Sequence, residues 1–562
     1  MRASPFAPPC LLALTLATLT LASPGLAVPV TVVATTDLHG RVGRTVALAG
    51  YLEVLRQQGT VVLVDAGDMF QGTLESNPNE GASVVAAYNQ LGYDAVTIGN
   101  HEFDFGPVGP DAVPRSKKDD PRGALKARAA EAKFPFLAAN ILDDATGKPV
   151  AWGNTVPSTL VDKKAGKARF KVGIIGVTSF DTPKTTMASN FVGLKMAPLA
   201  DAIVREAAAL RAKGARLIVV SAHAGGRCER VDVPDDLSSC DTGEEVFELA
   251  RALPAGVVDM IAAGHTHNQV AHLVNGIPVV EAWANGQGFS RVDFDVDVGA
   301  KAAGPARLKK LHPPRRLCAG DAEPCALDPY EGHAPHLDAS LGKTLEPWLA
   351  SAAELKARKL GVSAAGVVKR SYDDESLLGN LMADVILEAA PGSDVALMNG
   401  GGIRADLPSG SLTYGHVFEV MPFDNRIAVI KTRGSDLRKW LQNKLSSKHG
   451  GFLSIAGVQV EVACNGSKAG VTMTRPDGRT IGDDDRIAIA TTDFLASGGE
   501  SFRLPDATVS LDEGELLRER LVASLTRRKV LKSEEPTVFD PAKPRFSAID
   551  GKNPRCGKRA GK

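Results

Sequence analysis

The stretch "TIGNHEFDFG", residues 97–106, follows an apolar run and brings Asn100, His101 and Asp104 within five positions of one another. Loops collect polar residues, so this segment alone fits a solvated turn as well as a functional site. Other apolar runs rich in Val and Ile also end in small polar clusters. They are "VPVTVVATTDLHG", "TVVLVDAGD", "RFKVGIIGVT", "ARLIVVSAHAGG" and "VDMIAAGHTHN".

Helical stretches separate several of these runs. One example is "LADAIVREAAALRAKGA", whose apolar spacing suits an amphipathic helix. Buried strands that alternate with helices predict an α/β layered fold. Because ligands bind outside the carboxyl ends of such strands, the polar clusters lie where a site is expected.

Length and charge narrow the classes of protein. The 562 residues exceed the roughly 250–300 at which a single core stops growing, so two domains are expected. Lys+Arg and Asp+Glu both total 65, which indicates neither a nucleic acid polymer nor a membrane surface as partner. The basic tail, residues 551–562, is expected to be a frayed, solvated terminus.

The first residues predict export. Residues 1–27 contain Arg2, a short apolar run from Leu11 to Ala22 and a small-residue end, which is typical of a signal peptide. The run is too short to span a bilayer, and no later segment reaches the length of a membrane span. We expect a periplasmic or extracellular mature chain that starts near Val28.

Six cysteines remain after the signal peptide, and six allow 15 pairings. Short separations favour Cys228–Cys240 and Cys318–Cys325, which leaves Cys464–Cys556. A metal site or free thiols are the alternatives. The absence of any C-x-x-C pair and an oxidising compartment favour disulfides.

A change of pattern divides the chain. Residues 341–360, "LGKTLEPWLASAAELKARKL", predict a connecting helix with Pro347 in its first turn. From about 362 the pattern restarts with "DDESLLGNLMADVILEAA", a predicted helix with Asp374 as N-cap. The segment "SDVALMNGGGIRADLP" predicts a strand that enters a glycine-rich turn. Later strands are predicted in "RIAVIKTRG", "GVQVEVA" and "DRIAIATTDFLASGGESF".

The polar residues at the strand ends have the chemistry of metal ligands. They are Asp37, His39, Asp68, Asn100, His223, His265 and His267. Any one histidine is more often a core or surface residue than a ligand. Here, however, Asp37 and His39, and likewise His265 and His267, are two residues apart, and such residues point the same way in an extended chain, so each pair can reach one point. Carboxylate, imidazole and amide suit Zn, Mn or similar ions. The set is too large for one tetrahedral ion and suggests two metals ~3.5–4 Å apart that share a carboxylate.

Five motifs in order carry a resemblance. "TTDLHG", "DAGDMFQG", "GNHEFD", "SAHAGG" and "GHTHN" resemble the calcineurin-like metallophosphoesterase domain of the secreted 5′-nucleotidase family. "MNGGGIRADLPSG" and "TTDFLASGGE" resemble its C-terminal substrate domain. The resemblance implies an α/β protein: a four-layer αββα catalytic domain over 28–335, a linker helix over 336–361 and an α+β substrate-binding domain over 362–550.

The resemblance also implies roles for these residues. One divalent ion takes Asp37, His39 and His267, the other takes Asn100, His223 and His265, and Asp68 bridges them. His101 is not a ligand but stabilises charge on the phosphate or the leaving group. Asp104 orients His101 and keeps it protonated, because an adjacent carboxylate raises a histidine pKa.

In the second domain the resemblance implies substrate contacts from Asn399 and Arg404 and a base clamp formed by Phe423 and Phe494. Each also has an ordinary interpretation, such as a surface arginine or a core phenylalanine. Glu500 stands where many members have Asp, a position associated with the ribose hydroxyls. The segment "KRSYDDES" stands where nucleotidases often carry an arginine that contacts the substrate. Both differences leave the preferred substrate open.

The function expected is that of an exported, monomeric dimetal phosphohydrolase. It would cleave a small-molecule nucleotide, a nucleoside 5′-monophosphate, by a metal-activated hydroxide. UDP-sugars, 2′,3′-cyclic nucleotides and 3′-nucleotides are alternative substrates for the same metal site. An inactive secreted binding protein is a weaker alternative, because all seven ligand positions are present.

Overall fold

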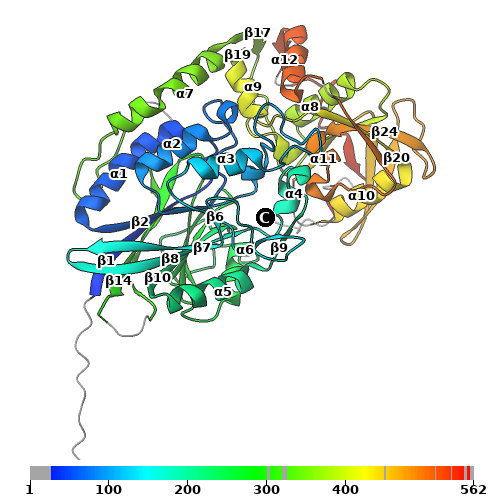
Figure 1. The fold of residues 1–562 in the computed structure, drawn as a ribbon. Coiled ribbons are helices and arrows are strands. Elements are labelled where there is room, and N and C mark those ends of the chain that lie inside the picture. The colour runs from blue at the N-terminus through cyan, green and yellow to red at the C-terminus, as the bar shows by residue number, and fades with distance from the viewer. Residues whose placement is uncertain are drawn as a thin grey trace, which may run out of the picture.

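The computed structural model describes residues 27–299, 304–318, 326–447, 451–512, 514–532, 534–549 and 554–556. The predicted signal peptide, except its last residue, and most of the basic tail lie outside these residues. Figure 1 shows two halves, joined by the long helix α7 (Ala339–Ala357).

Two sheets form the first half. The first has the order β15-β14-β1-β2-β3-β4-β6, with β16 also paired to β14. Its strands are β1 (Ala27–Thr35), β2 (Thr60–Asp65), β3 (Ala95–Thr97), β4 (Phe136–Leu137), β6 (Thr155–Val156), β14 (Gly288–Asp297), β15 (Arg307–Leu311) and β16 (Arg315–Arg316). Strands β1, β2, β3, β4 and β6 run parallel, so their carboxyl ends share one edge of the sheet.

The second sheet has the order β12-β13-β11-β10-β8-β7. Its strands are β7 (Ser158–Ala165), β8 (Ala168–Thr178), β10 (Ala215–His223), β11 (Met260–Ala263), β12 (Gln269–Val274) and β13 (Ile277–Ala282). Here β8, β10, β11 and β13 are parallel. A separate pair, β5 (Ile141–Asp143) and β9 (Leu194–Met196), lies outside both sheets.

The two sheets pack face to face with helices outside. Val32 and Val64 of the first sheet share a buried cluster with Ile174 and Leu217 of the second. Helices α1 (Thr45–Gln58), α2 (Ala82–Leu91) and α3 (Gly123–Glu131) share a core with the outer face of the first sheet. Helices α5 (Leu199–Ala212) and α6 (Glu245–Ala252) do so with the second. The predicted αββα arrangement is confirmed.

Helix α7 begins earlier than the sequence pattern suggests. The Asp338 carboxylate accepts the N–H of Leu341 at 3.0 Å and caps its first turn. Pro347 therefore lies inside the helix, and the prediction that it occupies the first turn is wrong. Leu341 and Leu345 are buried in the core beneath the first sheet, so α7 is packed on the first half.

The second half is built on a five-stranded sheet of order β21-β18-β24-β20-β25 and two three-stranded sheets of order β19-β17-β26 and β23-β22-β27. Its strands are β17 (Lys359–Ala364), β18 (Val395–Asn399), β19 (Gly410–Thr413), β20 (Ile427–Arg433), β21 (Leu453–Ala456), β22 (Gln459–Asn465), β23 (Lys468–Thr474), β24 (Arg486–Thr492), β25 (Thr508–Leu511), β26 (Val530–Leu531) and β27 (Phe546–Ala548). Its helices are α8 (Leu377–Ala389), α9 (Tyr414–Val420), α10 (Gly434–Ser446), α11 (Asp493–Ala496) and α12 (Leu517–Arg528).

The N-cap of α8 differs from the prediction. Ser376, not Asp374, caps this helix, because its hydroxyl accepts the N–H of Gly379 at 3.1 Å. Two residues separate the predicted cap from the observed one. The composition of the segment, which offers three acids and a serine in succession, did not distinguish them.

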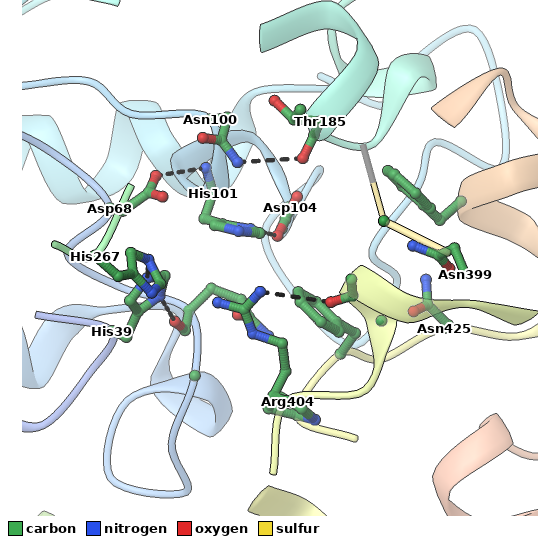
Figure 2. Close-up of a pocket in the computed structure, with 18 of the residues that line it drawn as sticks. His39, Asp68, Asn100, His101, Asp104, Thr185, His267, Asn399, Arg404 and Asn425 are labelled. Atoms are coloured by element: carbon green, nitrogen blue, oxygen red, sulfur yellow. Dashed lines mark hydrogen bonds and ion pairs between the residues drawn. The ribbon is translucent and has the colours of Figure 1, made fainter. Parts of the chain in front are cut away.

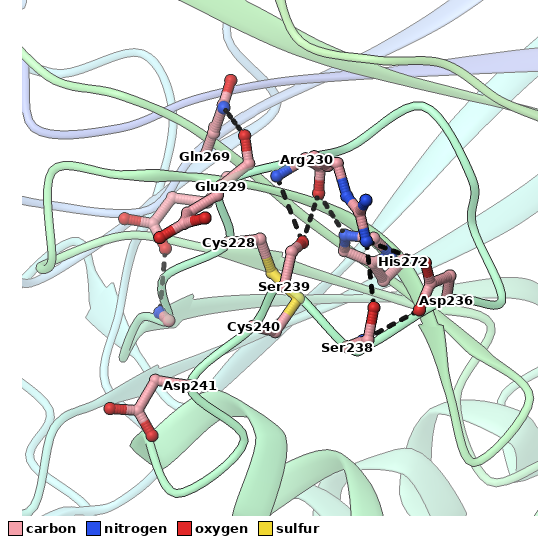
Figure 3. The surroundings of a disulfide bond; sticks show 12 residues. Cys228, Glu229, Arg230, Asp236, Ser238, Ser239, Cys240, Asp241, Gln269 and His272 are labelled. Atoms are coloured by element: carbon pink, nitrogen blue, oxygen red, sulfur yellow. Dashed lines mark hydrogen bonds and ion pairs between the residues drawn. A yellow bond between two sulfur atoms is a disulfide. The ribbon is translucent and has the colours of Figure 1, made fainter. Parts of the chain in front are cut away.

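Two of the predicted disulfides are present, Cys228–Cys240 and Cys464–Cys556. The third prediction involves Cys325, which lies outside the described residues. Figure 3 shows the loop closed by Cys228–Cys240, where Nε2 of His272 lies 2.9 Å from the carbonyl oxygen of Arg230.

The end of the chain is not wholly a solvated tail. The Cys464–Cys556 disulfide ties it to β22, and the side chain of Arg555 is only 5 % exposed. Nη1 of Arg555 lies 3.7 Å from Oδ1 of Asp373. The expectation of a frayed terminus is therefore wrong for residues 554–556, because a tertiary crosslink holds them.

Candidate active site

Both halves of the chain line one cleft of about 3130 Å³. The carboxyl ends of the parallel strands open into it from the first half. The glycine-rich turn after β18 and the segment after α9 face it from the second. A hydrogen bond joins the halves at its edge, where Nδ2 of Asn77 donates to the carbonyl oxygen of Pro422 at 2.8 Å.

A first cluster brings together Asp37, His39 and His267. Asp37 and His39 follow β1, and His267 follows β11, so each of the two sheets contributes. Nε2 of His39 lies 3.0 Å from Nε2 of His267, and Oδ1 of Asp37 lies 3.4 Å from Nε2 of His267. Burial raises the pKa of Asp37, but the nearby His267 ring outweighs this and brings that pKa to about 2.

A second cluster forms around His223 at the end of β10. Its Nε2 lies 2.9 Å from Oδ1 of Asn100, 3.1 Å from Oδ2 of Asp68 and 3.1 Å from Nδ1 of His265. Asp68 follows β2 and Asn100 follows β3, so this cluster also draws on both sheets.

The hydrogen bonding of the histidines fits metal ions. Nδ1 of His39 lies 2.8 Å from the carbonyl oxygen of Gln71, and Nδ1 of His223 lies 2.9 Å from that of Ala66. A carbonyl only accepts, so each Nδ1 carries a proton, and in the neutral ring this leaves the lone pair on Nε2, as in protein metal sites. Nε2 of His223 faces the acceptor oxygens of Asn100 and Asp68, a grouping that needs a positive charge at its centre. That charge is either a proton on Nε2, which the raised pKa of His223 (about 10) favours, or a bound cation in its place.

Asp37 supplies a second observation. Its Oδ1 is buried and, within the described part of the chain, has no hydrogen-bond partner. A buried carboxylate oxygen is rarely left without one. The donor set, made of carboxylates, imidazoles and one amide, is the type that binds divalent ions such as Zn or Mn.

His101 lies between the clusters and the second half. Its ring centroid is 5.4 Å from that of His39 and 5.6 Å from that of Phe423. Nδ1 of His101 bonds to Oδ2 of Asp104 at 2.5 Å, while Thr186 donates to the other oxygen at 3.1 Å. Burial lowers the pKa of His101, but the Asp104 carboxylate outweighs it, and the pKa is raised above its usual value.

The second half supplies a cation. Figure 2 shows Arg404 and Asn399 across the pocket from His39, Asp68 and Asn100. The guanidinium carbon of Arg404 lies 5.9 Å from the centre of the Phe423 ring. Burial lowers the pKa of Arg404, while the carboxylates Asp68 and Asp37 act in the opposite direction. The Arg404 charge therefore lies within electrostatic reach of both clusters.

Glu500 is engaged by two partners. Nδ2 of Asn399 donates to its Oε1 at 2.9 Å, and Nζ of Lys444 pairs with its Oε2. Phe494 lines the same cleft, and a Cβ added at Gly499 would lie 2.6 Å from its ring, so a larger residue there would displace the ring. No direct ring contact joins Phe423 and Phe494 in the described part of the chain.

Sequence reasoning missed Lys444 and two buried carboxylates, Glu102 and Glu281, behind the clusters. No local motif identifies Lys444. Glu102 stands inside the "GNHEFD" segment. Glu281 is the one charged residue of β13, "IPVVEA", and a charge in an otherwise apolar strand was a usable signal.

Comparisons with known proteins agree with this geometry. A family model described as calcineurin-like phosphoesterase matches residues 30–269, and one described as 5′-nucleotidase, C-terminal domain, matches residues 353–506. The chain belongs to the 5′-nucleotidase family of calcineurin-like phosphoesterases. These two domains and the homologues indicate a metal-dependent hydrolase of phosphoric esters.

Relatives with similar sequences match most of the chain. Protein UshA of Yersinia enterocolitica is 26% identical over 475 residues, which cover 80% of each chain. The 5′-nucleotidase of Vibrio cholerae is 25% identical over 514 residues, 84% of this chain and 85% of that one. Endonuclease YhcR of Bacillus subtilis is 28% identical over 84% of this chain, which spans 37% of that larger protein.

A solved structure shares the fold. The 5′-nucleotidase precursor from Thermus thermophilus superposes with a TM-score of 0.69 at 24% identity and covers 93% of this chain and 99% of that one. Among the described residues of this chain, no helix is long and apolar enough to cross a membrane.

Proposed function

We propose that this protein is an exported 5′-nucleotidase that uses two divalent ions to hydrolyse nucleoside 5′-monophosphates to nucleoside and phosphate. One observation carries the proposal. His101, which lies beside the metal-ligand clusters of the first half, is also 5.6 Å from the ring of Phe423 in the second half. A phosphate held at the clusters is then within one nucleotide's reach of an aromatic surface.

In this proposal, Asp37, His39 and His267 hold one ion, Asn100, His223 and His265 hold the other, and Asp68 joins them. The ions supply water activation and neutralise charge on the phosphate. Asp68 lies within reach of His223 and His265, and its Oδ1 accepts the backbone N–H of His101 at 2.8 Å. Asp68 thus connects the proposed ligand set to His101, the residue that acts on the phosphate.

The remaining polar groups act on the substrate. His101, held by Asp104, donates a hydrogen bond to the phosphoryl oxygens or to the leaving oxygen, where charge develops. Arg404 offers a planar, always charged fork for the phosphate. Phe423 and Phe494 flank the base. Glu500, held in place by Asn399 and Lys444, accepts hydrogen bonds from the ribose hydroxyls.

Cellular location and oligomeric state complete the proposal. The predicted signal peptide and the two disulfides favour a periplasmic or extracellular location. The form proposed is a monomer that acts on small nucleotides.

The test is phosphate release from AMP by the purified mature protein with added Mn²⁺, against a chelated control. UDP-glucose and 2′,3′-cyclic AMP are run in parallel and followed by product analysis. Metal-dependent turnover that is fastest on AMP supports the 5′-nucleotidase. Turnover confined to another ester keeps the metal site and assigns a different substrate, and two bound metals without turnover favour a binding protein.

A further inference from the structure

The backbone is strained where the metal ligands lie. Five of the seven proposed ligands have φ in the left-handed region: Asp37 (51°), His39 (48°), Asp68 (56°), His265 (79°) and His267 (58°). Residues other than glycine adopt this region only where the surrounding structure holds them there. Something outside the ligand set must therefore hold these turns before an ion binds.

Glu102 holds one group of ligands. Its Oε2 accepts the backbone N–H groups of Asp68 at 2.9 Å and Gly99 at 2.7 Å. Its Oε1 accepts those of Met69 at 2.7 Å and Phe70 at 3.3 Å. The side chain thus ties the turn after β2, which carries Asp68, to the turn after β3, which carries Asn100.

Glu281 does the same on the second sheet. From β13, its Oε1 accepts the hydroxyl of Thr266 at 2.7 Å and the N–H of Asn268 at 3.2 Å. Its Oε2 accepts the N–H of Gly226 at 3.0 Å. It therefore ties the turn that carries His265 and His267 to the segment that follows His223.

We propose that Glu102 and Glu281 are positioning residues of the metal centre, which hold the strained ligand turns at the spacing that two ions require. The inference rests on the proposed metal site and goes beyond it, because neither carboxylate belongs to the ligand clusters. Both residues are 1 % exposed, and each carboxylate accepts hydrogen bonds from two separate segments of the chain.

The two residues have different consequences because they hold different ligands. Glu102 holds Asn100, a proposed ligand of the second ion, and Asp68, which joins the two ions. Glu281 holds a turn with one ligand of each ion. Loss of Glu102 should weaken the second ion most, whereas loss of Glu281 should weaken both.

The chain offers a matched control in Asp259. This carboxylate is 6 % exposed and accepts the N–H groups of Ile218 and Ala306, each at 2.6 Å, together with a bond from Arg211. It lies before β11 and beside the beginning of β10, whereas the ligands lie beyond the other ends of these strands. Its amide variant makes the same chemical change away from the metals.

The experiment compares Glu102→Gln, Glu281→Gln and Asp259→Asn with wild type. Each amide keeps the shape but turns one acceptor into a donor that faces N–H groups. The metal-free proteins are titrated with Mn²⁺ by calorimetry, and their thermal midpoints are recorded. We expect about 10–100-fold weaker binding, mainly of the second ion in Glu102→Gln and of both ions in Glu281→Gln. Asp259→Asn should lower the thermal midpoint but keep wild-type affinities.

Wild-type affinities in both glutamine variants would overturn the inference, as would an equal loss in Asp259→Asn, since that would mean general loosening. If a glutamine variant does not fold, Thr266→Val removes one bond to Glu281 and keeps the carboxylate. It should weaken both ions to a smaller extent, and unchanged binding counts against the inference. If the wild-type protein itself binds only one ion, the proposed dimetal function is wrong, an outcome distinct from failure of the positioning role.

Discussion

Removal of the His101 imidazole separates catalysis from metal binding. His101 lies outside both ligand clusters, and its Nδ1 is bonded to Asp104. His101→Ala should therefore leave close to two ions per chain. It removes one preorganised donor beside the phosphate, and the loss of such a donor costs about 10²–10³ in kcat, or about 2.7–4 kcal/mol. KM should change much less, because Arg404 and the aromatic residues remain.

The assay pairs steady-state kinetics on AMP with metal analysis by mass spectrometry. His312→Ala is the matched control, because His312 also pairs with an aspartate, Asp293 at 2.8 Å, but does not line the cleft. Asp104→Asn should act through His101, so the double variant should be about as slow as His101→Ala alone. Loss of metal in His101→Ala, or effects that multiply in the double variant, would refute this separation of roles.

Three further predictions follow from other contacts. Phe423→Leu should raise KM for AMP by the equivalent of about 1–3 kcal/mol of lost base stacking, with little change on p-nitrophenyl phosphate, which has no base. Replacing Cys464 and Cys556 by serine should lower the free energy of unfolding in urea by about 2–4 kcal/mol. Removal of Cys228–Cys240 should cost less, because that disulfide closes a sequence separation of 12 residues whereas Cys464–Cys556 closes one of 92. Burial raises the pKa of Asp293, but its hydrogen bonds outweigh this and hold the pKa well below the usual range. Asp293→Asn should therefore be less stable than wild type at pH 7 by urea unfolding, and the difference should shrink as pH falls below about 4, where the unfolded carboxyl is protonated.

The sequence predicts most of the elements, and the gathering of the candidate ligands at one edge, for a shared reason. In a parallel sheet a strand is a short apolar run, and the residues just after it lie at the functional edge. His223 illustrates this, because it ends the apolar run of β10 and lies 2.9 Å from Asn100, which follows β3. Residues 123 positions apart meet because the same rule applies to both strands.

Features that depend on a single contact are not visible in the sequence pattern. The first residue of α7 depends on one bond to Asp338, and the N-cap of α8 depends on the hydroxyl of Ser376. The buried position of Arg555 depends on a disulfide to a strand 92 residues away. Helical periodicity carries no information on which nearby polar group caps a helix, because several of them satisfy the same composition rule.

The relation between the two halves is the part of the site that sequence could not supply. The proposed metal ligands all come from the first half, whereas Arg404 and Phe423 come from the second. Their mutual placement depends on contacts such as the bond from Asn77 to the Pro422 carbonyl, one residue before Phe423. Asn77 also accepts the backbone N–H of Gly72 at 2.8 Å, and the neighbouring Gln71 carbonyl bonds His39. One short chain of hydrogen bonds thus links the position of the Phe423 ring to that of His39, so in the proposed function substrate binding and metal geometry depend on each other.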